Sequence, residues 1–265
     1  RNIPATDAIK EFVSTHRPQN AVVVGGGFIG LEMVENLKNL GLEVDLVEMA
    51  PQVMPPLDRE MAAFVHHHLR AKGVRLHLGT AVTGFSEQPE GRLQVAVSQG
   101  EPLAADLVIL AIGVRPESSL AREAGLATNP RGAIITNSRL QTPDPDIYAI
   151  GDAIEVRDFV NGSPTVIPLA GPANKQGRIV ANNIAGIEEE YHGTQGTSIA
   201  KVFDLVVATT GNNERSLRQA ALDYQRVIIH PNSHAGYYPG ALPMTIKVLF
   251  APETGKILGA QIVGY

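Results

Sequence analysis

The chain has 265 residues, of which 44% are hydrophobic and 18% are charged, and its formal net charge at pH 7 is -5. This length and composition suit a globular fold with one large domain or two smaller ones. The lysines and arginines form no basic stripe, no apolar run approaches the roughly 18 to 20 residues of a membrane span, and the first residues lack the apolar stretch of a signal peptide. We therefore expect a cytoplasmic protein that binds neither nucleic acid nor membrane.

Cysteine is absent from the sequence, so the chain itself forms neither a disulfide nor a thiolate nucleophile. The chain begins at an arginine and ends within ILGAQIVGY, which has the pattern of a strand. We expect it to be a fragment of a longer protein.

The first segments alternate between strand and helix patterns. Residues 20–25 (NAVVVG) are apolar and β-branched, which predicts a strand, and residues 42–49 (LEVDLVEM) alternate like a second strand. Between them, FIGLEMVENLKNLG predicts a helix that stops at Gly41. Its apolar face is predicted from four residues at helical spacing, namely Ile29, Met33, Leu37 and Leu40. This order is typical of a βαβ unit.

A second helix is predicted from Asp58, a suitable N-cap residue, to Lys72, where Gly73 follows. It contains the run His66–His68, but adjacent helical residues point in different directions and no acidic or cysteine partner has the spacing of a metal site. We expect a solvated helix there and no metal. After it, VRLHLG predicts a strand, several short runs predict an antiparallel meander, and residues 107–112 predict a final buried strand.

From Leu120 the pattern changes to loops rich in glycine and proline, followed by a helix predicted from Ala173 to Ile184. Within the loops, TPDPDIYAIGDA predicts an apolar strand that ends in Gly151 and Asp152. Open α/β sheets bind ligands at the carboxyl ends of their strands, while a turn or a helix cap is the alternative role for this carboxylate. Beyond Thr194, β-branched runs predict a sheet-rich region.

Three glycines after the first strand form the most informative motif. Gly25, Gly27 and Gly30 make up G-x-G-x-x-G at the mouth of a helix in a βαβ unit, a pattern that binds dinucleotides. In that role they allow a tight turn, the approach of a pyrophosphate and the packing of helix on strand, in that order. Glu48, at the end of the second strand, would accept hydrogen bonds from the adenosine ribose hydroxyls and repel a 2′-phosphate, which favours NADH over NADPH. A structural turn and a solvated strand end are the alternatives.

Six motifs occur in an order that is similar to that of a known family. They are GGGFIGLE, ILAIGVRPESSLA, DIYAIGDA, IPLAGPANKQGR, GTSIAKVFDLVVATTG and SHAGYYPGALP. Over essentially its whole length the chain resembles the flavin-dependent pyridine nucleotide–disulfide oxidoreductases. Within that family it looks most like the coenzyme A-disulfide reductases and the NADH-dependent persulfide reductases.

The resemblance implies an α/β fold in three parts. A Rossmann-like NADH-binding domain would cover residues 1–119, the second part of an FAD-binding domain residues 120–190, and the start of an α+β dimerisation domain residues 191–265. The first FAD segment would precede this sequence. The resemblance also implies a homodimer.

For the flavin, the resemblance implies contacts from Gly151, Asp152, Leu169 and Ala170. Asp152 would bind the ribityl or pyrophosphate part of FAD. Leu169 and Ala170 would lie along the flavin. The helix predicted from Ala173 would aim its N-terminus at the isoalloxazine C2 carbonyl, where negative charge grows on reduction.

On the nicotinamide side, the resemblance implies Phe28 as an aromatic lid, Ile29 as a further cofactor contact and Gly113 as a point of close backbone approach. Glu32 would lie near the nicotinamide carboxamide and flavin N5 and take part in catalysis. An ordinary apolar contact for Phe28 and a solvated acid for Glu32 are the alternatives.

Two residues are implied at the substrate. Tyr237 matches a tyrosine that reaches across the dimer toward the partner's substrate sulfur, where a phenol would donate a hydrogen bond or a proton to a leaving thiolate. Packing at the interface is its alternative role. Asn174 aligns with a substrate-contacting position that is histidine in some relatives, so it departs from the pattern.

The implied function is an FAD-dependent oxidoreductase that passes hydride from NADH through the flavin to coenzyme A disulfide, coenzyme A persulfide or polysulfide. That reaction needs a thiolate, so the redox cysteine would lie outside this sequence. An NADH oxidase or peroxidase of the same family and a non-catalytic NADH-binding module are the alternatives.

Overall fold

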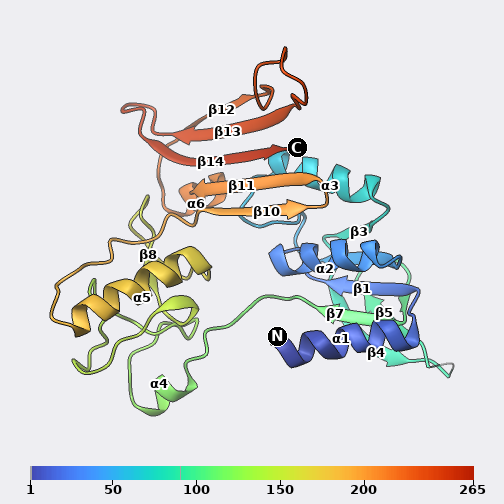
Figure 1. Ribbon diagram of the computed structural model, residues 1–265, viewed down its shortest axis with the longest axis horizontal. Coiled ribbons are helices and arrows are strands. Elements are labelled where there is room, and N and C mark those ends of the chain that lie inside the picture. Colours follow the sequence, from blue (N-terminus) through green and yellow to red (C-terminus); the bar gives the residue numbers. More distant parts are fainter. Residues whose placement is uncertain (1, 90) are drawn as a thin grey trace. The chain divides into compact units, whose positions relative to one another are not determined.

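The computed structural model describes residues 2–89 and 91–265, and Figure 1 labels most of their helices and strands. The chain divides into two compact units. The first unit runs to Gly113 and includes Ala200–Val206, and the second unit comprises Val114–Ile199 and Val207–Tyr265. None of the helices in this described part of the chain is long and apolar enough to span a membrane.

A parallel sheet with the strand order β3-β2-β1-β7 forms the centre of the first unit. Its strands are β1 (Asn20–Val24), β2 (Glu43–Glu48), β3 (Arg75–Leu78) and β7 (Leu107–Leu110). The helices are α1 (Ile3–His16), α2 (Phe28–Asn39) and α3 (Arg59–Ala71), and an antiparallel sheet contains β4 (Val82–Glu87), β5 (Leu93–Val97) and β6 (Leu103–Ala105). The predicted βαβ unit, second helix and meander are confirmed.

Burial in this unit follows from the parallel sheet. Strand β2 is buried from Val44 to Val47 without alternation, because a strand between two parallel neighbours is covered on both faces. Helix α2 packs through a buried face that consists of Gly30, Leu31, Val34 and Leu37. Of the predicted face only Leu37 is buried, whereas Ile29 and Leu40 are 52% and 63% exposed. Because α2 has apolar residues on several of its sides, their spacing alone predicted the wrong buried face.

Two other elements differ from the prediction. Strand β7 ends at Leu110 and is only partly buried, because it lies at the edge of the sheet, whereas a buried strand to Ile112 was expected. Helix α1 was not predicted, although Ile9, Phe12 and Val13 stand at helical spacing and are partly buried. Asn2 caps this helix and accepts a hydrogen bond from the Ala5 N–H at 3.0 Å.

The second unit begins with loops and short elements, namely α4 (Ser119–Glu123), a 3-10 turn (Gly151–Ala153), β8 (Val156–Arg157) and β9 (Pro164–Thr165). Its long helix, α5 (Ala170–Ile184), begins before the predicted Ala173. Pro172 falls in the first turn, where the missing N–H costs no hydrogen bond. The strand predicted before Gly151 does not form. Among the described residues, Tyr148 makes only an isolated β-bridge to Gln141.

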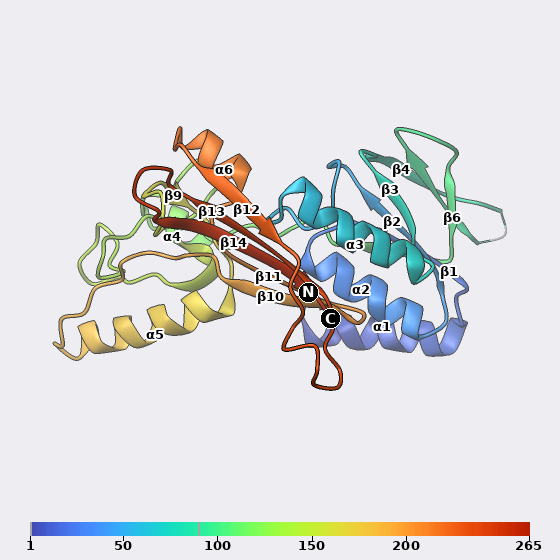
Figure 2. The ribbon, with the colours of Figure 1, turned by 90° about the horizontal axis from the view of Figure 1, so that it is seen from above.

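A five-stranded sheet with the order β10-β11-β14-β13-β12 follows, and Figure 2 shows its long strands side by side. The strands are β10 (Ser198–Val202), β11 (Leu205–Gly211), β12 (Gln225–Ile229), β13 (Met244–Phe250) and β14 (Ile257–Gly264). The β-branched runs predicted this sheet correctly. They did not predict α6 (Glu214–Gln219), which Asn213 caps by accepting from the Ser216 N–H at 2.9 Å.

The turn between β10 and β11 belongs to the first unit. Phe203 in this turn is buried, has a φ of +53°, and donates its N–H to the Glu35 carboxylate of α2 at 2.8 Å. Its ring meets the His68 ring of α3 edge-on, with the centroids 6.1 Å apart. Lys72, which follows α3, forms an ion pair with Asp204. We call these contacts the hairpin clasp.

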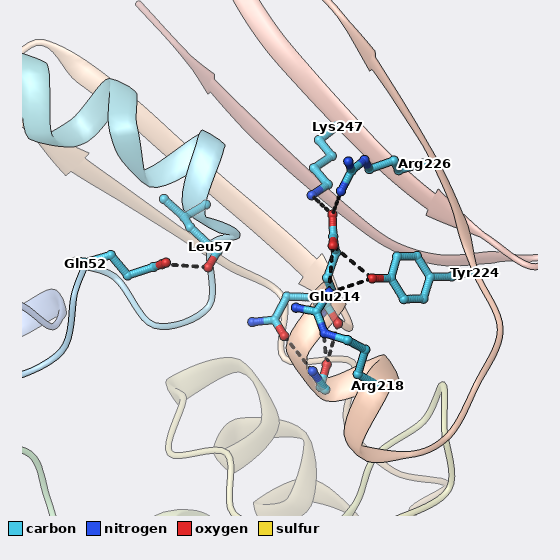
Figure 3. Close-up of polar contacts among 9 residues, drawn as sticks. Gln52, Leu57, Glu214, Arg218, Tyr224, Arg226 and Lys247 are labelled. Carbon is cyan, nitrogen blue, oxygen red and sulfur yellow. Dashed lines mark hydrogen bonds and ion pairs between the residues drawn. The ribbon is translucent and has the colours of Figure 1, made fainter.

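A charged cluster joins α6 to β12 and β13 in the second unit (Figure 3). The Glu214 carboxylate accepts hydrogen bonds from Lys247 (2.5 Å), Arg226 (2.7 Å), Tyr224 (2.9 Å) and Arg218 (3.0 Å). The Lys247 side chain is fully buried and that of Glu214 is 8% exposed. Burial by itself raises the pKa of Glu214, but the hydrogen bonds and the nearby positive charge outweigh it and lower the pKa to about 2. We call this set the Glu214 cluster.

Candidate active site

The loop between β1 and α2 is shaped by two glycines that no other residue can replace. Gly25 has a φ of +108°, and a Cβ there would lie 2.3 Å from the Ala111 carbonyl oxygen. A Cβ on Gly30 would lie 1.9 Å from the carbonyl oxygen of Gly25. These glycines therefore set how closely α2 packs against the loop and against the end of β7.

Gly27 differs from these two glycines. It is the N-cap of α2 with an ordinary extended conformation, and a Cβ there would meet no atom within 4 Å. Its missing side chain leaves open space at a helix N-terminus, where unpaired N–H groups and the positive end of the helix dipole favour an anion. The arrangement fits the pyrophosphate of a dinucleotide.

The Glu48 carboxylate is fixed beside this loop by backbone groups. Its Oε2 accepts from the Gly26 N–H at 2.6 Å, and its Oε1 accepts from the Ala50 N–H at 2.7 Å. A Cβ on Gly26 would lie 3.2 Å from Oε2 and 2.8 Å from the Val53 side chain. Gly26 was not among the predicted site residues, although its place inside the glycine triplet was the available signal.

A cavity of about 550 Å³ connects these residues within the first unit. Gly25, Gly27, Glu48 and Gly113 all line it, and Gly113 has a φ of +102°. Apolar side chains form much of the remaining wall, including Met49, Pro55, Val82, Phe85 and Ile112. A polar end at a glycine loop and an apolar wall suit the phosphate and the base of a dinucleotide.

Three predicted residues lie on the first turns of α2 outside this cavity wall. Phe28 is partly buried, and Ile29 and Glu32 are exposed. Within the part of the chain that the structure describes, the Glu32 carboxylate has no hydrogen-bond partner. The structure thus places these side chains next to the glycine loop, and their contacts with a cofactor stay predictions.

The predicted flavin residues lie around the N-terminal end of α5 in the second unit. Gly151 has a φ of +75° and donates its N–H at 2.7 Å to Gln176, a buried side chain on α5 that the sequence analysis missed. Asp152 follows it and lines a pocket of about 440 Å³ together with Arg115 and Arg131. A carboxylate in an open polar pocket can accept hydrogen bonds from the hydroxyls of a bound flavin nucleotide.

Leu169 is the N-cap of α5, and Ala170 is its first residue. No side chain caps this helix, so its first N–H groups are available to a ligand. Asn174 lies one turn further and is exposed, and its Nδ2 donates to the Ala170 carbonyl oxygen at 2.9 Å. Its Oδ1 and the second hydrogen of its Nδ2 remain for a substrate.

Tyr237 lies in the loop between β12 and β13 and is 83% exposed. Its ring contacts that of Tyr238, with the centroids 4.8 Å apart. His234 holds the loop through hydrogen bonds to the Ser233 hydroxyl at 3.1 Å and to the Pro239 carbonyl oxygen at 3.3 Å. A phenol so exposed is free to reach a separate molecule.

In the histidine run only His67 is exposed, so the prediction of a solvated helix is wrong for His66 and His68. His68 is 5% exposed, and His66 accepts a hydrogen bond from the Val53 N–H at 3.2 Å. Burial is the main cause that lowers the pKa of both rings. Among the described residues, no group of three or more His, Cys, Asp or Glu side chains could hold a metal ion. These histidines pack and position loops.

Comparison with known proteins gives the same pattern over the whole chain. Residues 2–177 match the pyridine nucleotide-disulphide oxidoreductase family model, and residues 197–265 match the dimerisation domain of that family. The chain is 36% identical over its full length to an NADH oxidase of Methanocaldococcus jannaschii and 35% identical over 98% of its length to a CoA-dependent NAD(P)H sulfur oxidoreductase of Pyrococcus furiosus. It covers only 58% and 59% of these two relatives.

Among solved structures, the reduced Bacillus anthracis protein named CoADR-RHD matches the whole chain with a TM-score of 0.96 and 54% identity, over 47% of its own length. Members of the matched family use FAD and NAD(P)H. The chain belongs to the pyridine nucleotide-disulphide oxidoreductase family.

Proposed function

We propose that this chain is part of an FAD-dependent oxidoreductase that passes hydride from NADH through the flavin to a sulfur substrate. The substrate is coenzyme A disulfide, coenzyme A persulfide or polysulfide, and the protein acts as a cytoplasmic homodimer. The main support for NADH as the hydride donor is the glycine loop, in which the Glu48 carboxylate accepts hydrogen bonds from the Gly26 and Ala50 N–H groups. Similarity to the sulfur oxidoreductase and to CoADR-RHD supports the sulfur half.

The proposal also assigns a role to each of three parts of the chain. Residues 1–119 bind NADH, residues 120–190 form the second part of the FAD-binding domain, and residues 191–265 begin the dimerisation domain. The family match to a dimerisation domain supports the last assignment.

Glu48 selects NADH by its remaining acceptor capacity. An ionised carboxylate offers about four lone-pair positions. The Gly26 and Ala50 N–H groups occupy two of them, which leaves two for the two hydroxyls of an adenosine ribose. The same fixed negative charge repels a 2′-phosphate.

A bound flavin would supply the chemistry of accepting hydride and passing an electron pair to sulfur. Asp152 would orient its ribityl or pyrophosphate part, and Leu169 and Ala170 would lie along the ring, where the positive end of α5 favours negative charge. Gly151 supports this site by its bond to Gln176.

Toward the nicotinamide, Phe28 would cover the flavin until the nicotinamide arrives, and Ile29 would add an apolar contact. Glu32 would orient the carboxamide, and Gly113 would allow the backbone to approach. Their common role is to align the two rings and to exclude water from the hydride path.

The sulfur step requires a thiolate, and this chain has no cysteine, so we assign the redox cysteine to sequence outside it. From this chain, Tyr237 would donate a hydrogen bond or a proton to the leaving thiolate in the partner protomer. Asn174 would contact the substrate through its side-chain amide.

Replacing Gly27 by alanine separates ligand binding from folding. A Cβ at this position meets nothing in the protein, so we expect Gly27→Ala to leave the melting temperature unchanged and to weaken NADH binding about tenfold or more, because the methyl group occupies the space of the pyrophosphate. Thermal unfolding and NADH titration measure the two effects. As a contrast, Gly30→Ala should lose several kcal/mol of stability, since its Cβ would overlap a backbone oxygen. Undiminished NADH affinity in Gly27→Ala would contradict the proposed pyrophosphate site.

The sulfur half is tested on the full-length flavoprotein. We expect thiol release from coenzyme A disulfide or coenzyme A persulfide to exceed NADH-dependent oxygen uptake. We also expect Tyr237→Phe to slow sulfur-substrate turnover roughly a hundredfold, as loss of an acid catalyst does, while NADH still reduces the flavin at the wild-type rate. Dominant oxygen uptake would favour the NADH oxidase alternative, which the 36% identity to the archaeal oxidase supports. Binding of NADH without any turnover would indicate a binding module.

A further inference from the structure

A polar pocket of about 290 Å³ in the second unit is surrounded by arginines from three separate segments. Arg115 lies in the loop after β7, Arg122 lies on α4, and Arg131 lies in the turn after Pro130. This pocket adjoins the one that contains Asp152 and shares Arg115 and Arg131 with it. Arg122 and Ser118 line only the arginine-rich pocket, and Asp152 lines only the other one.

The three guanidinium groups lack partners. Within residues 2–89 and 91–265, none of the three forms an ion pair or a side-chain hydrogen bond, whereas six other arginines are paired with carboxylates. These six are Arg75, Arg92, Arg139, Arg178, Arg218 and Arg226. The net charge of the chain is -5, so carboxylates are plentiful. Three unpaired positive groups around one pocket repel one another, and an anion between them would relieve that repulsion.

A buried hydroxyl in the pocket wall also lacks a partner. Ser118 is 2% exposed, and its Oγ has no hydrogen-bond partner among the described residues. It is the N-cap of α4 but makes no capping hydrogen bond. Leaving a buried hydroxyl unpaired costs free energy, and such groups in native proteins commonly serve a ligand or a water molecule.

The turn that carries Arg131 is held in place without a ligand. The Asn129 Oδ1 accepts from the N–H groups of Arg131 and Ala133, each at 2.9 Å, and its Nδ2 donates to Glu155 at 2.8 Å. Gly132 has a φ of +85°, which the turn requires. The backbone of the pocket is thus fixed, and little ordering would oppose binding.

We propose that this pocket binds a phosphate-type dianion, either inorganic phosphate or the phosphate group of a small monoester. Arginine forks match phosphate oxygens in geometry and charge, and the Ser118 hydroxyl supplies a further donor. The assignment depends neither on the sulfur substrate nor on the choice of nicotinamide cofactor. It gives the protein a second anion site besides the glycine loop of the first unit.

The test is a titration of the full-length, FAD-loaded protein with inorganic phosphate and with glycerol 1-phosphate in chloride buffer at constant ionic strength. Phosphorus NMR and calorimetry report binding. We expect saturable binding that Arg122→Gln weakens roughly ten- to hundredfold, the effect of losing a charged hydrogen bond, and that Ser118→Ala weakens several-fold. Arg139→Gln removes the same charge from the same unit outside the pocket and should leave the affinity unchanged.

Tighter binding of glycerol 1-phosphate would identify the ligand as a monoester, and tighter binding of inorganic phosphate would identify the free anion. Folding does not obscure the result, because deletion of the unpaired Ser118 hydroxyl should leave the melting temperature in chloride unchanged or slightly raised. Absence of saturable binding, or equal binding by wild type and Arg122→Gln, would overturn the proposal. Loss of bound flavin absorbance in Arg122→Gln would also overturn it, since the arginines would then belong to the flavin site.

Discussion

Replacing Glu48 by arginine should reverse the cofactor preference of the full-length enzyme. The variant loses the carboxylate that the proposal assigns to the ribose hydroxyls, and it gains a guanidinium that binds a 2′-phosphate. The variant loses the two proposed hydrogen bonds between the Glu48 carboxylate and the ribose hydroxyls, and each is worth about 1.5–3 kcal/mol. We therefore expect the ratio of kcat/KM for NADH to that for NADPH to fall by a hundredfold or more. Steady-state kinetics with both nucleotides measures the ratio.

Glu48→Gln is the matched control, because it keeps the size of the side chain and removes the charge. It should shift the preference in the same direction but less, since an amide neither repels nor attracts a phosphate strongly. Its carbonyl oxygen can still accept from one of the Gly26 and Ala50 N–H groups, while its NH2 group faces the other, so one backbone hydrogen bond is lost with the charge. An unchanged ratio in Glu48→Arg would show that the nucleotide ribose lies elsewhere.

Breaking the Glu214 cluster should cost more stability than any other single change considered for the second unit. Glu214→Gln removes the carboxylate that is paired with the buried ammonium of Lys247, and removal of one partner of a buried ion pair typically costs 3–5 kcal/mol. Urea unfolding of the full-length protein measures the loss. The double variant Glu214→Gln/Lys247→Met should recover most of it, because no uncompensated buried charge remains. A double variant no more stable than Glu214→Gln would assign the loss to packing.

The same cluster predicts a pH dependence with a definite sign. The pKa of Glu214 is depressed from 4.5 to about 2, so the folded state holds this proton less tightly than the unfolded state does. The contribution is therefore complete above pH 4.5, where it amounts to about 3 kcal/mol, and is lost as the pH falls toward 2. The stability difference between wild type and Glu214→Gln should be constant from neutral pH down to about 5 and then shrink. A difference that grows on acidification would contradict this assignment.

Local sequence was sufficient for the parts of the fold in which neighbours in sequence are neighbours in space. The βαβ unit, the glycine loop and the sheet-rich end follow from apolar runs, periodicity and turn residues, and Glu48 could be placed because it ends a strand. Helix α1 was missed although Ile9, Phe12 and Val13 stand at helical spacing, which was the available signal. Apolar residues on several sides of α2 made its buried face undecidable from spacing alone.

The remaining parts depend on contacts between distant segments. Glu214 is stabilised by Arg226 and Lys247 from strands that follow it, and a lone glutamate in the sequence does not reveal them. Gln176 meets Gly151 across 25 positions, and Gly26 acquires its role only when Glu48 folds back onto it. Interactions of this kind set the chemistry of the sites and become visible only in three dimensions.

The hairpin clasp belongs to a first compact unit that is discontinuous in sequence. Phe203 and Asp204 complete the packing of α2 and α3, although more than 100 positions separate them from those helices. A polypeptide cut after residue 119 would thus lack a buried aromatic ring and would leave the Glu35 carboxylate without its backbone donor. The proposed boundary at residue 119 therefore does not coincide with the compact units of the structure. Hydrogen exchange in α2 and α3 should therefore respond to changes in the β10–β11 turn.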